Sequence, residues 1–145
     1  MRRAIVEAVR VLLVDHNKDF VSKASDWLVS DSGIDLVGTA ATGKEAIEAV
    51  GRLVPDVVVF DESLPDMRIV DVMRRIQSSE TAPRIVLLTL HEGETVRQVK
   101  AVTGADEVLT RSRVTQRLLP VIHELPRTKR STNGTRPTES TRSEP

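Results

Sequence analysis

Short aliphatic runs alternate with segments of helical periodicity along most of the chain, and this alternation constrains the fold more than any other feature. Three of the runs, VRVLLV, DVVVF and RIVLL, are almost continuously apolar and rich in β-branched residues. Runs of this kind are typical of parallel strands that are buried on both faces of a sheet. The five predicted strands cover residues 9–14, 34–37, 56–60, 85–88 and 106–109.

Between these runs, apolar residues recur at the three- and four-residue spacing of amphipathic helices. Thr42 and Glu45 form a capping-box pattern before the second predicted helix. Pro120 is expected to kink the fifth helix or to end it early. Five strand–helix units in strict alternation predict a (βα)5 flavodoxin-like α/β fold, a doubly wound parallel sheet with strand order 2-1-3-4-5.

Composition and charge narrow the class of protein. A length of 145 residues fits one domain. Lys+Arg and Asp+Glu each number 21, so the chain lacks the basic excess of a typical nucleic-acid binder. The absence of cysteine excludes disulfides and thiolate metal sites. The sequence has no apolar stretch of membrane-spanning length and no signal-peptide pattern, so a soluble cytoplasmic domain is expected.

The composition changes near Pro126. Residues 126–145 contain almost no apolar side chains and hold five basic and two acidic residues. A segment that can bury so little apolar surface does not offset the entropy cost of becoming ordered. We therefore predict a disordered tail or linker over residues 126–145 and a single folded domain over residues 1–125.

Polar residues follow four of the five predicted strands. Asp15 and His16 follow the first strand, Asp61 the third, Thr89 the fourth and Arg111 the fifth. In open α/β sheets, ligands bind beyond the carboxyl ends of the strands, where the strand order reverses, and this order places Asp15 beside Asp61. Two adjacent carboxylates are stabilised by a hard cation such as Mg²⁺, and an Asp can accept a phosphoryl group as an acyl phosphate. The pattern indicates a phosphoryl site.

These segments resemble the receiver domain of two-component response regulators over about residues 9–125. VRVLLVDHNKDF is similar to the first strand and acidic pocket of the family, and PDVVVFDESLPDM to the segment with the phosphoacceptor. RIVLLTLHEG and GADEVLTRS are similar to the segments with the switch hydroxyl and the terminal cation. TGKEAIEAVGRLVPD resembles the second helix of receivers joined to LuxR-type DNA-binding domains.

The resemblance implies a role for each residue of the pocket. Asp61 matches the phosphoacceptor, and Thr89 and Arg111 match the hydroxyl and the cation that act on the phosphoryl group. Asp15 and Asp61, together with the backbone carbonyl of Ser63, match the ligands of Mg²⁺.

The positions that depart from the family pattern include Ser112, which replaces a proline, and three that bear on the proposed chemistry. His16 stands where a second metal-binding acid is usual. A surface histidine is the favoured interpretation, and the alternative, a ligand role, would weaken Mg²⁺ binding or favour Mn²⁺. Arg111 replaces a lysine, and its planar fork differs from a compact ammonium group. Val108 replaces an aromatic residue, so the usual aromatic relay is not expected.

The leading hypothesis is a signal-transduction receiver domain, not an enzyme, that accepts a phosphoryl group on Asp61 from a histidine kinase or phosphotransfer protein. Phosphorylation would switch the face of the fourth helix, fifth strand and fifth helix. That face would bind a downstream protein or a second copy in a homodimer. Neither a membrane nor nucleic acid is expected as a partner of this chain.

Two other functions compete with this hypothesis. The near alternative is a pseudo-receiver, an interaction module that works without phosphorylation, which the substitutions at His16, Arg111 and Val108 favour. A phosphatase of the haloacid-dehalogenase type is disfavoured, because Asn17 stands where its second Asp is expected.

Overall fold

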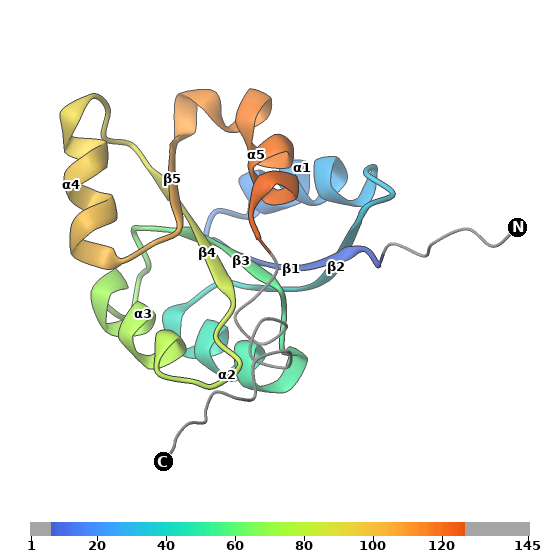
Figure 1. Cartoon of the computed structure of the whole chain (residues 1–145), viewed down its shortest axis with the longest axis horizontal. Coiled ribbons are helices and arrows are strands. Elements are labelled where there is room, and N and C mark those ends of the chain that lie inside the picture. The colour runs from blue at the N-terminus through green and yellow to red at the C-terminus, as the bar shows by residue number, and fades with distance from the viewer. Residues whose placement is uncertain (1–6, 127–145) are drawn as a thin grey trace, which may run out of the picture.

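The computed structural model describes residues 7–126, which form a five-stranded parallel sheet between two layers of helices (Figure 1). The strands are β1 (Val9–Val14), β2 (Ile34–Ala40), β3 (Val57–Asp61), β4 (Arg84–Thr89) and β5 (Glu107–Thr110). Their order in the sheet is β2-β1-β3-β4-β5. The predicted flavodoxin-like fold and strand order are therefore confirmed. Apart from Pro126, the predicted disordered tail lies outside the described residues.

The helices cover both faces of this sheet. They are α1 (Lys18–Val29), α2 (Gly43–Leu53), α3 (Ile69–Gln77), α4 (Glu94–Thr103) and α5 (Val114–Glu124), with a short 3-10 turn, η1 (Arg111–Arg113), before α5. Side chains of α1 and α5 pack on one face, and side chains of α2, α3 and α4 pack on the other. Within residues 7–126, no helix has the length and apolar character needed to cross a membrane.

Alternate residues of the central strands belong to two separate apolar cores. Leu12 and Phe60 pack with α2 and α3, whereas Leu13 and Val59 pack with α1 and α5, and all four side chains are fully buried. Successive side chains of a strand point to opposite faces, so both sets must be apolar when both faces are covered. This double burial explains why the strands appear in the sequence as continuous aliphatic runs.

Side-chain caps fix the starts of two helices near the carboxyl edge of the sheet. The Asn17 side chain accepts a hydrogen bond from the Phe20 N–H at 3.0 Å at the start of α1. The Thr42 hydroxyl accepts one from the Glu45 N–H at 3.1 Å at the start of α2. The Glu45 carboxylate accepts the Ala41 N–H at 2.9 Å, so the predicted pair does cap α2, with the return bond one residue before the cap.

α5 continues through Pro120 as far as Glu124, so the predicted early end at Pro120 is wrong, and the other predicted outcome, a kink, stays a prediction. A proline inside a helix removes one backbone donor and leaves the carbonyl four residues earlier without its helical partner. Pro120 and Gln116, which carries that carbonyl, both lie on the exposed side of α5. Water can therefore satisfy the carbonyl, while Leu118 and Ile122 keep the opposite side of the helix on the core.

Candidate functional site

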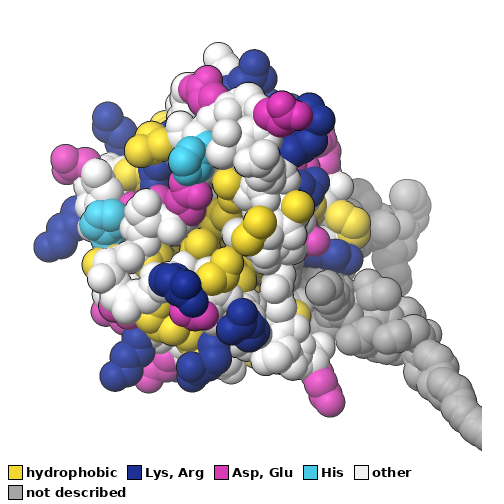
Figure 2. Space-filling view, turned by 90° about the vertical axis from the view of Figure 1, so that its left-hand side faces the viewer, with side chains coloured by type: hydrophobic (Ala, Val, Ile, Leu, Met, Phe, Trp, Pro, Cys, Tyr) yellow, Lys and Arg dark blue, Asp and Glu magenta, His cyan; other side chains and the backbone are white. Residues whose placement is uncertain are grey.

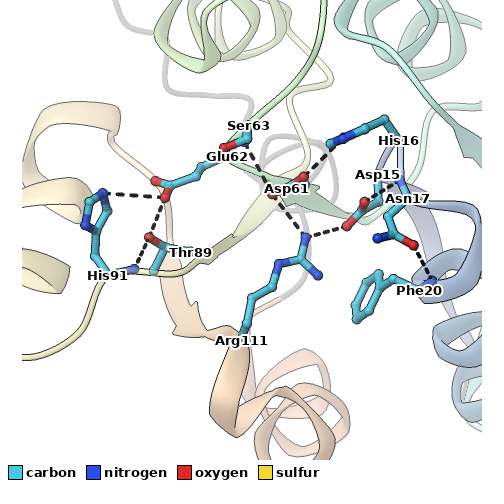
Figure 3. A network of polar contacts seen from close by, with 10 residues as sticks. All are labelled: Asp15, His16, Asn17, Phe20, Asp61, Glu62, Ser63, Thr89, His91 and Arg111. Carbon is cyan, nitrogen blue, oxygen red and sulfur yellow. Dashed lines mark hydrogen bonds and ion pairs between the residues drawn. The ribbon is translucent and has the colours of Figure 1, made fainter.

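Polar side chains from several strand ends gather around a small cavity at the carboxyl edge of the sheet (Figure 3). β1 and β3 are in register at Val14 and Phe60, so the residues that follow, Asp15 and Asp61, lie side by side. Figure 2, which looks onto this edge, shows acidic and histidine side chains close together. The cavity has a volume of about 280 Å³, and it is lined by Asp15, His16, Asn17, Asp61, Glu62, Ser63, Leu90 and Arg111.

Arg111 bridges the two carboxylates. Its Nη2 atom donates to Asp15 Oδ2 at 2.5 Å and lies 3.0 Å from Asp61 Oδ1. The Asp15 side chain is 0% exposed and that of Asp61 is 9% exposed, whereas Arg111 is 22% exposed. Two neighbouring carboxylates repel each other, and a guanidinium between them offsets that repulsion with charge-assisted hydrogen bonds.

The ring of Phe20 packs against the same guanidinium. Arg111 Cζ lies 4.5 Å from the centroid of the Phe20 ring, a distance at which a cation is attracted to an aromatic face. Burial of the guanidinium lowers the pKa of Arg111, but the hydrogen bonds and charges of Asp15 and Asp61 outweigh burial, and the pKa lies above its usual value. Arg111 is therefore a permanent cation held in one place.

His16 and Ser63 both contact Asp61. His16 Nδ1 lies 3.5 Å from Asp61 Oδ2, although 51% of the His16 side chain is exposed. The backbone N–H of Ser63 donates to Asp61 Oδ1 at 3.3 Å. The His16 side chain thus lies at the surface, and its ring is directed at the acid pair. The predicted roles of His16 and of the Ser63 carbonyl as metal ligands stay predictions.

Thr89 is fully buried, and its hydroxyl makes two hydrogen bonds. It donates to Glu62 Oε2 at 2.6 Å and accepts the backbone N–H of His91 at 3.0 Å. The imidazole Nε2 of His91 lies 3.7 Å from the same Glu62 oxygen. Figure 3 shows Glu62, Thr89 and His91 as one group beside the group formed by Asp15, Asp61 and Arg111.

The acid pair provides ligands that suit a divalent cation. One ligand atom from each of Asp15, His16 and Asp61 lies within 4.8 Å of the others. Carboxylate oxygens suit Mg²⁺ and Mn²⁺, and an imidazole nitrogen moves the preference toward transition metals. The donor set therefore fits a divalent cation, but such an ion competes with Arg111, which already offsets the charge of both carboxylates.

The structure brings together the residues that the sequence placed at the strand ends, and it adds two that the sequence left without a role. Glu62 was visible as the residue after Asp61, but nothing in the sequence indicated that its side chain turns toward Thr89. Phe20 has no polar group that would mark it as a site residue, and its contact with Arg111 depends on how the chain after β5 places the guanidinium.

Two solved structures of response regulator domains share this fold. The response regulator domain of CheB from Thermotoga maritima matches with a TM-score of 0.73 and 24% identity, over 81% of this chain and 96% of that chain. The receiver domain of the putative response regulator NarL from Mycobacterium tuberculosis matches with a TM-score of 0.70 and 24% identity, over 82% of this chain and 99% of that chain. At such identities the likeness concerns the fold alone, an α/β protein with a parallel sheet between two layers of helices.

A family model described as the response regulator receiver domain matches residues 11–123. The chain therefore belongs to the response regulator receiver domain family, and it is a receiver of two-component signalling, as the strand-end motifs predicted. The pseudo-receiver alternative is not favoured by these matches.

The curated relatives are longer proteins. Protein-glutamate methylesterase/protein-glutamine glutaminase 2 of Pseudomonas fluorescens is 34% identical over 133 residues, which are 85% of this chain and 36% of the relative. The corresponding protein 4 of Geobacter metallireducens is 42% identical over 79 residues, 54% of this chain and 23% of the relative. The chain thus spans about a third of the length of the first of these relatives.

Proposed function

We propose that Asp61 is the phosphoacceptor of this receiver domain. The observation that carries the proposal is the state of its two carboxylate oxygens. Oδ1 is engaged by Arg111 and by the Ser63 N–H, whereas the contact found for Oδ2 within residues 7–126 is the longer one to His16, at 3.5 Å. Oδ2 is therefore the oxygen that is available as a nucleophile.

In the proposed step, Asp61 Oδ2 attacks the phosphorus of a phosphohistidine or of a small phosphodonor. A new P–O bond forms on Asp61, the bond between phosphorus and the donor breaks, and the donor leaves with the electron pair of that bond. Arg111, 3.0 Å from the carboxylate, offsets the negative charge that accumulates there. Thr89 donates to an oxygen of the bound phosphoryl group once its hydroxyl is available.

A divalent cation belongs to this proposal, and Asp15, Asp61 and the Ser63 carbonyl would hold it, with His16 as an alternative further ligand. When bound, Mg²⁺ or Mn²⁺ supplies positive charge that stabilises the transferring group. His16→Asp tests the metal part, because a third carboxylate suits Mg²⁺ better than an imidazole does. Its Mg²⁺ affinity, measured by calorimetry, should rise and approach its Mn²⁺ affinity. Unchanged affinities would place His16 outside the ligand set.

The partners follow from the family. We infer that a cytoplasmic histidine kinase or phosphotransfer protein supplies the phosphoryl group. The face of α4, β5 and α5 then binds a downstream protein or a second copy of the chain. Residues 1–125 act as the receiver, and the methylesterase activity in the relatives' names is assigned to the part of those proteins that this chain does not match.

Acetyl phosphate tests the proposal without a kinase. Incubation with acetyl phosphate and either Mg²⁺ or Mn²⁺ should add the mass of one phosphoryl group to the intact protein. Asp61→Asn should abolish the adduct, while Asp66→Asn serves as a control, because Asp66 contacts the start of α2 rather than the acid pair. No Asp61-dependent adduct under either metal would overturn the proposal.

A further inference from the structure

The hydroxyl that is expected to act on the phosphoryl group is already engaged. A threonine hydroxyl has one hydrogen to donate, and Thr89 gives it to Glu62 Oε2 at 2.6 Å. The acceptor is a carboxylate, so the bond is charge-assisted and stronger than one between neutral groups. In this state Thr89 has no hydrogen left for a phosphoryl oxygen on Asp61.

The surroundings of this bond favour its persistence. Thr89 is 0% exposed, and 18% of the Glu62 side chain is exposed, so water competes weakly for either group. The His91 N–H donates to Thr89 Oγ1 at 3.0 Å and fixes the hydroxyl oxygen, while the His91 ring lies 3.7 Å from the carboxylate. Glu62 thus holds Thr89 in a defined arrangement.

We propose that Glu62 is a positioning residue that retains the Thr89 hydroxyl in the unmodified protein and must release it before Thr89 can bind a phosphoryl group on Asp61. This inference rests on the proposed function of Asp61. Glu62 is the next residue after Asp61, so a phosphoryl group there adds negative charge close to the Glu62 carboxylate. Like charges repel, and the same event that requires Thr89 therefore weakens its bond to Glu62.

Substitution of Glu62 should make phosphorylation easier. With Glu62→Ala, the acetyl phosphate concentration that gives half-maximal phosphorylation should fall by about tenfold, the effect of losing one hydrogen bond to a charged group. Glu62→Gln keeps a weaker acceptor and should give an intermediate fall. Glu92→Ala is the matched control, since it removes the same charge from a residue whose carboxylate contacts Ser112 instead of Thr89.

A double-mutant cycle separates retention of the hydroxyl from simple repulsion between charges. In the background of Thr89→Val, which removes the hydroxyl and keeps the side-chain volume, the effect of Glu62→Ala should be clearly smaller, because only the charge repulsion remains to be relieved. An equal tenfold effect in both backgrounds would assign the effect of Glu62 to its charge and overturn the inference.

A second measurement needs no phosphodonor. Amide exchange at His91, whose N–H bonds to Thr89 Oγ1, should accelerate in Glu62→Ala, because the freed hydroxyl moves. If the wild-type protein is phosphorylated on Asp61 but Glu62→Ala changes neither amide exchange nor phosphorylation, this inference is overturned. The proposed function then stays intact. No adduct in any variant would instead contradict the proposed function, and with it the role of Glu62.

Discussion

At the scale of single residues, the candidate site depends on one cation shared by two acids. Asp15 is 0% exposed, and its Oδ2 atom accepts the guanidinium of Arg111, while Oδ1 accepts the Asn17 N–H at 2.9 Å. A buried carboxylate without such partners is costly, and breaking a buried ion pair leaves an uncompensated charge. Arg111 therefore contributes to the folded state as well as to the proposed chemistry.

Arg111→Gln should lower the free energy of unfolding by about 3 kcal/mol, because Asp15 and Asp61 lose the charge that offsets their repulsion. Mg²⁺ or Mn²⁺ should restore part of the lost stability, because the ion offsets the repulsion between the two carboxylates in place of Arg111. Urea unfolding followed by circular dichroism, with and without metal, measures both effects. Arg113→Gln, an exposed neighbour in η1, is the control. Equal stability of Arg111→Gln and wild type would contradict the structural role of Arg111.

At the scale of elements, the end of α2 and the end of α5 carry features that can be tested independently of the pocket. Val54 follows α2 with φ of 47°, a left-handed conformation that is unfavourable for a β-branched residue. At the same amino edge of the sheet, His123 of α5 donates to Asp31, which follows α1, at 2.9 Å. Val54 is thus the first residue after α2, and the Asp31–His123 hydrogen bond joins the loop after α1 to the end of α5.

Val54→Gly and Val54→Ala remove the same branched side chain, but only glycine relieves the left-handed conformation. Val54→Gly should therefore be more stable than Val54→Ala by about 1 kcal/mol in the free energy of unfolding. Thermal and urea unfolding of the two variants measure the difference. If alanine proves as stable as glycine, the conformation of Val54 is not strained.

The hydrogen bonds from His123 and from the Gly33 N–H hold the pKa of Asp31 below its usual value. A lowered pKa in the folded state adds stability above the unfolded pKa, and this stability is lost as the pH falls through the folded value. Wild type should thus exceed Asp31→Asn in stability at about pH 6 and lose that advantage toward about pH 3. Urea unfolding at both pH values measures this difference in stability, and Asp35→Asn, at an exposed position, is the control. A pH-independent gap would contradict this account.

At the scale of the whole molecule, sequence periodicity predicted the fold because buried parallel strands and amphipathic helices leave different patterns. The juxtaposition of Asp15 and Asp61 followed as well, since parallel strands end at one edge. The sequence did not reveal features that depend on the direction of a side chain or on the exposure of a single residue. The bond of Thr89 to Glu62 is one case, and the continuation of α5 through an exposed Pro120 is another.

The helices are not equally anchored in this fold. In α4 the buried residue is Thr103, whereas α2 and α5 each bury four residues. Segments with few buried contacts open at lower free energy. Amides of α4 should therefore exchange with solvent faster than those of α2 and α5 in native-state hydrogen exchange. Protection of α4 equal to that of α5 would argue against α4 as the mobile part of a switch.

The central claim is that Asp61, rather than its neighbour Asp15, accepts the phosphoryl group. Borohydride converts an acyl phosphate on an aspartate to homoserine, so the acceptor can be located by peptide mass spectrometry after treatment with acetyl phosphate and metal. The account predicts homoserine at position 61 and unmodified Asp15. Homoserine at position 15, or at neither position, would contradict it.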